Sequence, residues 1–259
     1  MDIKMIVCDL DKTLLRRDGT VSAYSRGVIE KCREQGILFG IATARTTIAC
    51  KDLTDLLAPH VLVTDGGALG RCGGHEAYKA MMGPEQAKEI MAILHKHKGR
   101  GVGIITASCE NGYFIDTDLA KGHAWWDVLR PEYCDLSNGF TCGAYKIVPQ
   151  IFDEAVVEEI AGFTRVGITR FFGEEWTNFS DTMAGKWNAV AACANYLGIA
   201  PEQIAAFGDD FSDLEMLANC GAGVAVANAI PEVKAVAKYI CGTNEEDGVA
   251  VWLEEFLCK

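Results

Sequence analysis

Residues 4–8 form a short apolar run without polar alternation, which is typical of a strand buried on both faces of a parallel sheet. The run ends in two carboxylates, Asp9 and Asp11, with one residue between them. A buried carboxylate is costly unless it is paired, hydrogen-bonded or bound to a metal. This segment is therefore either an ordinary exit from a strand into a loop or the beginning of a site.

Segments of the same kind recur along the chain and alternate with segments that have helical patterns. Strands are expected at residues 4–8, 37–43, 61–64, 204–207 and 222–226, and helices at residues 22–35, 46–57, 186–196 and 213–217 and from Pro231 onward. Alternating strands and helices predict an α/β fold with a doubly wound parallel sheet.

The middle of the chain breaks this alternation. Helical patterns over residues 85–98 and 153–162 are mixed there with short strand-like pieces at 102–107 and 145–148. We expect an inserted α+β domain over residues 82–180. The sheet domain is then assembled from residues 1–81 and 181–259.

The composition restricts the partners of this protein. The formal net charge of −12 argues against nucleic acid or an anionic membrane, since both require clustered Lys and Arg. No apolar run approaches the roughly 18 residues of a membrane span, and the first residues do not resemble a signal peptide. The 11 cysteines are scattered and include no C-x-x-C pair. We therefore expect a cytoplasmic protein with reduced thiols that is a monomer or a small homo-oligomer.

Four polar clusters fall at the expected strand ends or helix starts. They are "DLDKT" from Asp9, "TAR" from Thr43, the pair Gly185–Lys186, and "GDDFSD" from Gly208. Ligands of a doubly wound sheet bind outside the carboxyl ends of its strands. The four clusters are therefore expected to form one site.

The two aspartates of the first cluster suit phosphoryl transfer. In extended backbone, residues two apart point the same way. One carboxylate can attack a phosphorus atom, and the other can give a proton to the leaving oxygen and later take one from water.

A phosphate and two carboxylates are all anionic, so a cation must lie among them. Mg²⁺ takes oxygen ligands, and Asp209 and Asp213 are candidates to complete its site. Lys186 can supply positive charge to the phosphoryl group. Thr43 can supply a hydroxyl and nearby backbone N–H groups. The expected ligand is a small phosphorylated metabolite.

The four motifs, in this order, resemble those of the haloacid dehalogenase-like hydrolases. The insertion between the second and third motifs resembles the C2 cap of the Cof-type phosphatases in that superfamily. The resemblance covers nearly the whole chain and implies a Rossmann-like core, a cap domain and a Mg²⁺ cofactor.

The resemblance also implies residue roles. Asp9 is the nucleophile that forms an aspartyl-phosphate, and Asp11 is the general acid and base. The implied phosphate-binding residues are Thr43, Ala44, Lys186 and Asn228. The implied metal ligands are Asp9, the backbone carbonyl of Asp11, and Asp209. Asp213 is expected to hold the metal waters or the lysine.

Three positions depart from the family pattern. Ser212 stands where asparagine is usual in the fourth motif, Asp65 replaces an asparagine in the turn after the third strand, and Trp187 follows the lysine where glycine is common. These departures leave the core catalytic groups in place. They bear on the substrate and on the geometry of the metal.

The combined interpretation is a Mg²⁺-dependent phosphatase of small phosphorylated metabolites, with sugar phosphates as the family-level expectation. One alternative is a phosphomutase that uses the same nucleophile. Another is a phospho-accepting regulatory or sensor protein. Asp11 argues against a sensor, because a general base speeds hydrolysis of the acyl phosphate.

Overall fold

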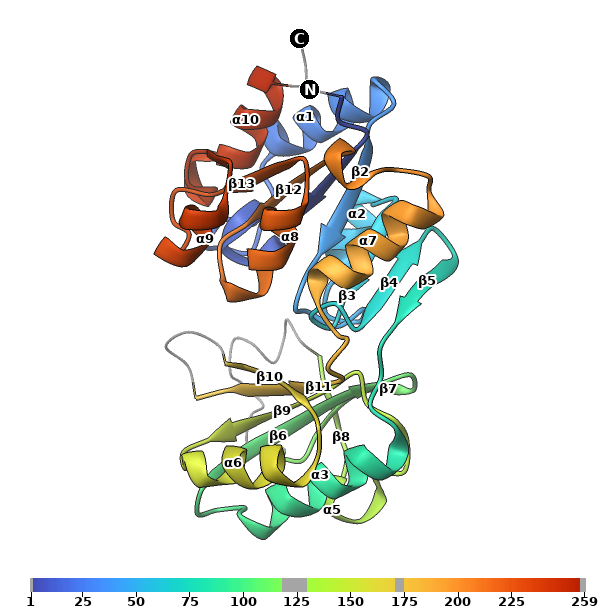
Figure 1. Cartoon of the computed structure of the whole chain (residues 1–259), viewed down its shortest axis with the longest axis vertical. Coiled ribbons are helices and arrows are strands. Elements are labelled where there is room, and N and C mark those ends of the chain that lie inside the picture. Colours follow the sequence, from blue (N-terminus) through green and yellow to red (C-terminus); the bar gives the residue numbers. More distant parts are fainter. Residues whose placement is uncertain (1, 118–129, 171–174, 257–259) are drawn as a thin grey trace. The chain divides into compact units, whose positions relative to one another are not determined.

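The computed structural model describes residues 2–117, 130–170 and 175–256, which fold into two compact units (Figure 1). We name them the core unit (Met1–Ala44, Leu53–Lys79 and Gly185–Lys259) and the inserted unit (Arg45–Asp52 and Ala80–Ala184). Each is described by itself below.

The core unit is built on one twisted sheet whose strands lie in the order β14-β13-β12-β1-β2-β3-β4-β5. The six strands from β14 to β3 are parallel: β14 (Tyr239–Ile240), β13 (Ala222–Ala225), β12 (Ile204–Gly208), β1 (Met5–Cys8), β2 (Leu38–Ala42) and β3 (Val61–Thr64). The expected parallel α/β sheet is confirmed. Strands β4 (Leu69–Cys72) and β5 (His75–Lys79) continue it as an antiparallel hairpin.

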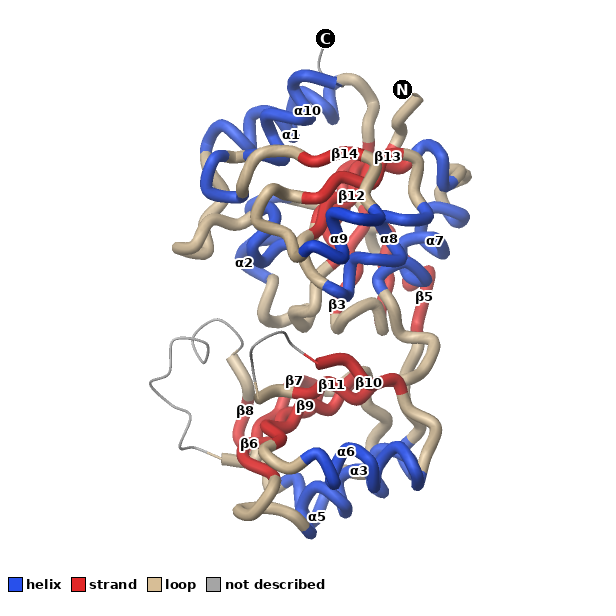
Figure 2. The backbone as a smooth tube through the Cα atoms, turned by 60° about the vertical axis from the view of Figure 1, so that its left-hand side comes forward, coloured by secondary structure: helices blue, strands red, loops and turns tan. Residues whose placement is uncertain are grey.

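Helices cover both faces of this sheet (Figures 1 and 2). Helices α1 (Ala23–Glu34) and α10 (Gly248–Phe256) pack against each other on one face, while α7 (Lys186–Tyr196), α8 (Leu214–Asn219) and α9 (Pro231–Val236) form a row on the other. Ser22 caps α1, and its side chain accepts a hydrogen bond from the Ser25 backbone N–H at 2.9 Å. This cap is the one that the sequence predicts.

Among the described residues, the core unit also contains short helical turns. They are η1 (Leu10–Leu14), η2 (Pro201–Gln203), η3 (Phe211–Asp213) and η4 (Asn244–Glu246). Turns η1 and η3 directly follow the strand ends that carry Asp9 and Asp209.

The helix expected over residues 46–57 is wrong in its first half, since α2 spans only Lys51–Leu57. Residues 47–50 form a turn in which the Thr46 hydroxyl accepts a hydrogen bond from the Ala49 backbone N–H at 3.1 Å. Thr46, Thr47 and Ile48 are β-branched, and a threonine hydroxyl that binds nearby backbone competes with helix formation.

The inserted unit is an α+β structure, as the sequence predicts. Its sheet has the order β10-β11-β9-β6-β7-β8, with all neighbours antiparallel except β7 and β8. The strands are β6 (Val102–Cys109), β7 (Gly112–Ile115), β8 (Glu132–Tyr133), β9 (Lys146–Ile151), β10 (Gly167–Arg170) and β11 (Thr177–Ser180), and the helices are α3 (Pro84–Lys96), α5 (Leu136–Gly139) and α6 (Glu154–Phe163).

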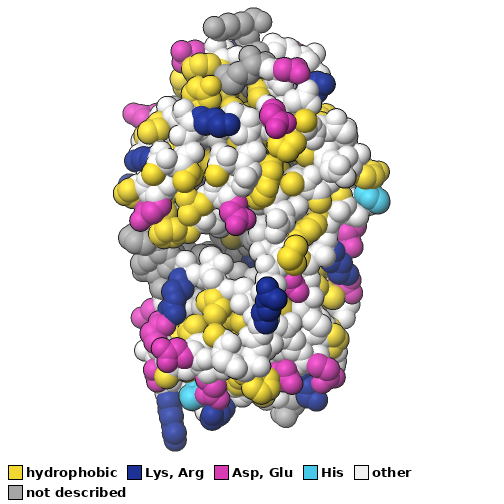
Figure 3. All heavy atoms as spheres, viewed as in Figure 1, with side chains coloured by type: hydrophobic (Ala, Val, Ile, Leu, Met, Phe, Trp, Pro, Cys, Tyr) yellow, Lys and Arg dark blue, Asp and Glu magenta, His cyan; other side chains and the backbone are white. Residues whose placement is uncertain are grey.

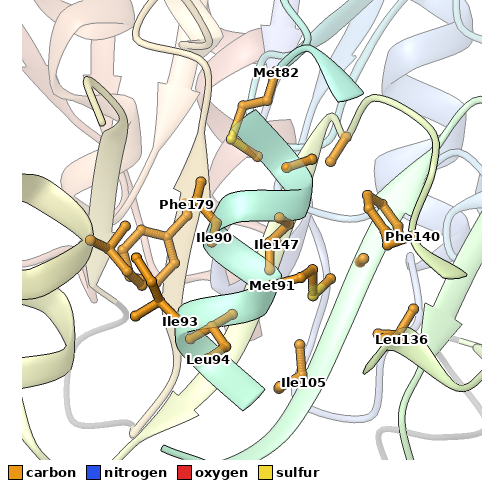
Figure 4. Close-up of a cluster of buried hydrophobic side chains, with 14 of the residues drawn as sticks. Met82, Ile90, Met91, Ile93, Leu94, Ile105, Leu136, Phe140, Ile147 and Phe179 are labelled. Carbon is orange, nitrogen blue, oxygen red and sulfur yellow. The ribbon is translucent and has the colours of Figure 1, made fainter. Parts of the chain in front are cut away.

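A cluster of buried apolar side chains holds the inserted unit together (Figure 4). Ile90 and Leu94 of α3 pack with Ile105, Ile147 and Phe179 of the sheet, and each is fully or almost fully buried. These contacts bind α3 to one face of the sheet through burial of apolar surface, independently of any site chemistry.

Lys and Arg are scattered among Asp and Glu on the face seen in Figure 3. Among the described residues, no helix has the length and apolar character required to span a membrane.

Replacing Phe179 with alanine should destabilise the inserted unit by about 3–5 kcal/mol, because it leaves a cavity in a closed core. Phe179 is 0% exposed, whereas Phe163 is 58% exposed and provides a matched control. Phe163→Ala should change stability by less than about 1 kcal/mol. Urea unfolding followed by circular dichroism measures both, and equal effects would contradict this description of the core.

Candidate active site

The strand order of the core unit reverses between β1 and β12, and we call this position the switch point of the sheet. From β1 the chain proceeds to β2 and β3 on one side, and from β12 to β13 and β14 on the other. In such sheets, ligands bind outside the carboxyl ends of the strands where the order reverses. Cys8 pairs with Phe207 at this point, so Asp9 and Asp209 follow neighbouring strand ends.

Lys186 joins two of the predicted carboxylates. Its Nζ lies 2.7 Å from Asp9 Oδ1 and 2.7 Å from Asp213 Oδ1. The exposed fractions are 3% for Lys186, 5% for Asp9 and 1% for Asp213. The structure thus brings together residues 177 and 27 positions apart in a nearly dry ion cluster.

Asp213 has a second function in the fold. Its Oδ2 accepts hydrogen bonds from the backbone N–H groups of Asp209 at 3.0 Å and Asp210 at 3.1 Å. A Cβ on Gly208 would lie 2.4 Å from the Cβ and Cγ of Asp213, so glycine is required where β12 passes this carboxylate. One aspartate therefore shapes the turn after β12 and holds the lysine.

Thr13 is a site residue that the sequence analysis missed. Its buried hydroxyl donates a hydrogen bond to Asp209 Oδ1 at 2.8 Å, across 196 positions of sequence. The available signal was a hydroxyl residue inside "DLDKT", but its partner is visible only after β1 and β12 pair. The bond fixes the orientation of the Asp209 carboxylate.

The acidic cluster has the chemistry of a cation site. Asp9, Asp209 and Asp213 each place one carboxylate oxygen within 4.8 Å of the others. When all are ionised, these three carboxylates face one ammonium group, so two negative charges remain uncompensated in a buried place. Oxygen ligands with excess negative charge fit a divalent cation such as Mg²⁺.

The pKa values of the groups in this cluster reflect the same excess of negative charge. Burial raises the pKa of Asp9 well above its usual value, although Lys186 opposes this shift. Burial, and then the charge of Asp213, raise the pKa of Asp209 to about 6. Burial alone would lower the pKa of Lys186, but attraction to Asp213 and Asp9 outweighs it and raises that pKa. A bound cation would offset the cost of burying these carboxylates.

Asp11 lies in a different environment from Asp9. The turn after β1 leaves Asp11 exposed, with φ −70° and ψ 127°, and puts the following residue, Lys12, at φ 60°. A solvent-exposed carboxylate beside a buried one is suited to exchange protons with water and with a bound group.

Thr43 and Ala44 follow β2, the strand beside β1. Thr43 is buried, donates from its backbone N–H to the Val63 carbonyl at 2.9 Å, and accepts at its carbonyl from Gly66 N–H at 3.1 Å. These bonds fasten the end of β2 to the turn after β3, at the same edge of the sheet as Asp9.

That turn has an unusual backbone. Asp65, Gly66 and Gly67 all have positive φ, of 55°, 71° and 95°. A Cβ on Gly67 would lie 2.1 Å from the Gly185 carbonyl carbon and 2.4 Å from the backbone nitrogen of Lys186. The glycine therefore permits close packing against the first turn of α7, which carries the lysine.

Three further residues singled out in the sequence, Ser212, Trp187 and Asn228, lie in different parts of the core unit. Ser212 lies half-buried in η3, and Trp187 is the half-buried second residue of α7. Asn228 is exposed in the loop before α9, where its Nδ2 donates to the Lys12 carbonyl at 2.7 Å. The catalytic, phosphate-binding and metal-binding roles of the predicted residues stay predictions at this point.

The sheet and the buried Asp–Lys–Asp cluster define an α/β protein with a site arranged for the chemistry of anionic groups. The sequence profile of the haloacid dehalogenase-like hydrolases matches residues 6–253, and the chain belongs to this family, as a Cof-type phosphatase.

Relatives and solved structures agree with this assignment. The 5-amino-6-(5-phospho-D-ribitylamino)uracil phosphatase YitU of Bacillus subtilis is 51% identical over 265 residues, covering 97% of each chain. YwtE of the same organism, which is named as a phosphatase of the same compound, is 27% identical over 98% of each chain. The HAD subclass IIB sugar phosphatase BT4131 has the same fold, with a TM-score of 0.85, 22% identity, and coverage of 99% of this chain and 100% of that chain.

Replacing Gly67 with alanine should reduce phosphatase activity at least about 10-fold, since displacement of α7 moves Lys186 away from its partners. Gly198 also has positive φ, of 69°, but nothing lies within 4 Å of an added Cβ, so Gly198→Ala isolates the backbone strain. The control should lose about 1–2 kcal/mol of stability and keep its activity. Equal loss of activity in both variants would contradict the role of this close contact.

Proposed function

We propose that this protein is a Mg²⁺-dependent phosphatase that hydrolyses phosphate monoesters of small polyhydroxy metabolites through an aspartyl-phosphate on Asp9. The observation that carries the proposal is the buried cluster in which Lys186 contacts both Asp9 and Asp213, beside Asp209. Such a cluster holds a nucleophile, a phosphate-neutralising ammonium group and metal ligands in one place.

For the substrate we propose 5-amino-6-(5-phospho-D-ribitylamino)uracil. A relative named for that activity is 51% identical over nearly the whole chain. In this proposed substrate, the phosphate ester is carried by a ribityl group, which is a sugar alcohol chain. This choice is a specific case of the sugar-phosphate class that the family resemblance favours.

In the first half of the reaction, an Asp9 carboxylate oxygen attacks the phosphorus atom. The bond between phosphorus and the ester oxygen breaks, and Asp11 gives its proton to the leaving alkoxide. Lys186 holds the Asp9 carboxylate and offsets charge on the phosphoryl oxygens. At the neighbouring strand end, Thr43 contributes its hydroxyl and Ala44 its backbone N–H to those oxygens.

In the second half, Asp11 takes a proton from water, and the resulting oxygen nucleophile attacks the same phosphorus atom. The bond between phosphorus and Asp9 breaks, so inorganic phosphate leaves and the carboxylate is restored. The exposure of Asp11 supports this role, because the attacking water must reach this carboxylate in the second half of the reaction.

The residues that would hold Mg²⁺ are Asp9, Asp209 and the backbone carbonyl of Asp11. Asp213 would act from the outer shell, since its two oxygens bind Lys186 and the turn after β12. When bound, the ion supplies positive charge to the phosphate and screens it from the carboxylates. Ser212 is close enough in sequence to contribute an oxygen, with a shorter reach than asparagine.

We also propose a catalytic domain at residues 1–81 with 181–259, and an inserted domain at residues 82–180 that is a C2-type cap. We further propose a cytoplasmic location, which the scattered cysteines support, and a monomer or small homo-oligomer. A phosphomutase would isomerise the substrate with little free phosphate, and a sensor would take up one phosphate and stop. Both are distinguished by following phosphate release over many turnovers.

Asp9→Asn should abolish the repeated release of phosphate, with a loss of at least about 10³-fold, because the amide is not a nucleophile. The control is Asp18→Asn, an exposed aspartate in the same segment. The assay follows inorganic phosphate from the ribitylamino-uracil phosphate, sugar phosphates, nucleotides and an aryl phosphate. Repeated turnover by Asp9→Asn would refute the nucleophile, and no turnover of any compound by the wild type would refute the phosphatase.

Chelation of divalent cations should abolish activity, and added Mg²⁺ should restore it. Asp209→Ala should lose Mg²⁺-dependent activity. Thr13→Val keeps the carboxylate but removes the hydroxyl that orients it, and should raise the Mg²⁺ concentration for half-maximal activity by about 10-fold or more. If Asp209→Ala kept its activity and metal dependence, the assigned metal site would be wrong.

A further inference from the structure

A second hydrogen-bonded network in the core unit has no place in the reaction described above. Its centre is Asn228, in the loop between β13 and α9. The side-chain Nδ2 donates to the Lys12 carbonyl at 2.7 Å, and Oδ1 accepts from the Asn244 backbone N–H at 3.0 Å. One amide thus joins the turn that carries Asp11 to the segment that leads into α10.

The carbonyl held by Asn228 belongs to a residue in an uncommon conformation. Lys12 has φ 60° and ψ 4°, in the left-handed region that residues other than glycine adopt rarely and only when their surroundings impose it. The φ angle of Lys12 sets the direction of the preceding peptide, which contains the Asp11 carbonyl. A contact that holds the Lys12 backbone therefore also holds the Asp11 backbone.

The segment that supports Asn228 also binds the three residues after the turn. Leu15 O accepts from Asn244 Nδ2 at 2.8 Å, Arg16 Nη2 lies 2.6 Å from Asp247 Oδ2, and Arg17 N–H donates to Glu245 Oε1 at 2.6 Å. Asn244 is only 8% exposed, so water competes little for its bonds. The residues that leave the turn are therefore also held by hydrogen bonds and an ion pair.

The loop that carries Asn228 is attached to the other acidic strand end too. The Ile230 backbone N–H donates to the Asp209 carbonyl at 3.0 Å, and the Val226 N–H donates to the Gly208 carbonyl at 3.3 Å. The same loop therefore bonds to the backbone on both sides of the switch point between β1 and β12. It is placed to hold Asp11 in register with Asp209.

We propose that Asn228 is a positioning residue that sets the orientation of Asp11 through the Lys12 carbonyl, rather than a ligand of the substrate phosphate. The proposal rests on the proposed phosphatase function, because Asp11 is its general acid and base. The Asn228 side chain bonds through both its Nδ2 and its Oδ1 to backbone groups of its own unit, which supports positioning.

The test uses Asn228→Asp and Asn228→Ala in the full chain. The aspartate keeps the acceptor for Asn244 and replaces the donor with an oxygen facing the Lys12 carbonyl. Both variants should lower kcat by about 10- to 100-fold, because Asp11 loses its alignment. In Asn228→Ala, which adds no charge, KM and the inhibition constant of inorganic phosphate should stay within about 2-fold, because phosphate contacts are unchanged.

A matched control is available in α8. Asn219 is also exposed, and its Nδ2 donates to the Glu215 carbonyl at 2.7 Å, the same type of bond at the same distance. Asn219→Ala should leave kcat unchanged. A loss of kcat in this variant equal to that of Asn228→Ala would overturn the proposal.

Amide hydrogen exchange provides a readout that does not depend on turnover. Exchange in the peptide covering residues 10–15 should accelerate about 10-fold or more in Asn228→Ala and remain unchanged in Asn219→Ala. Unchanged exchange at residues 10–15 would overturn the proposal. So would a rise in KM and in the phosphate inhibition constant at constant kcat. A wild-type protein that releases no phosphate would refute the proposed function, while hydrogen exchange would still decide the role of Asn228.

Discussion

The double contact of Lys186 with Asp9 and Asp213 is the interaction on which the architecture of the site depends. Lys186 is only 3% exposed, and its ammonium group is costly to bury unless opposite charges meet it at hydrogen-bonding distance. Two carboxylates meet it here, and a third, on Asp209, makes the cluster negative. The lysine therefore keeps the Asp9 carboxylate, which is the proposed nucleophile, in place, while the excess negative charge favours a cation.

Two glycines and the register of one strand pair in the core unit permit this contact. Gly67 lets the turn after β3 approach the start of α7, and Gly208 lets β12 pass the side chain of Asp213. The parallel register of β1 with β12 puts Asp9 beside the turn that follows Asp209. A side chain at either glycine would displace backbone or a charged group, so these positions are set by the site rather than by the stability of the sheet.

Much of this arrangement could be predicted from the sequence. Short apolar runs identify the central strands, and the polar residues that follow them must meet because parallel strands end at a common edge. The antiparallel β4–β5 hairpin, β14 and α10 were not predicted, since short edge elements carry weak periodicity. Thr13 and Asn244 were also missed, because their partners lie 196 and 229 positions away and only tertiary structure joins them. Asn228 was predicted as a site residue, but its bonds to Lys12 and Asn244 could not be anticipated from one chain.

The central claim is that Asp9 carries the phosphoryl group during turnover. The direct measurement is mass spectrometry of enzyme quenched in acid during steady-state hydrolysis of an aryl phosphate with Mg²⁺, followed by peptide mapping with and without hydroxylamine. The account predicts a phosphoryl group on Asp9 that hydroxylamine removes, as expected for an acyl phosphate. Active turnover with the phosphoryl group on another residue, or with no phosphorylated peptide at any time in the reaction, would contradict it.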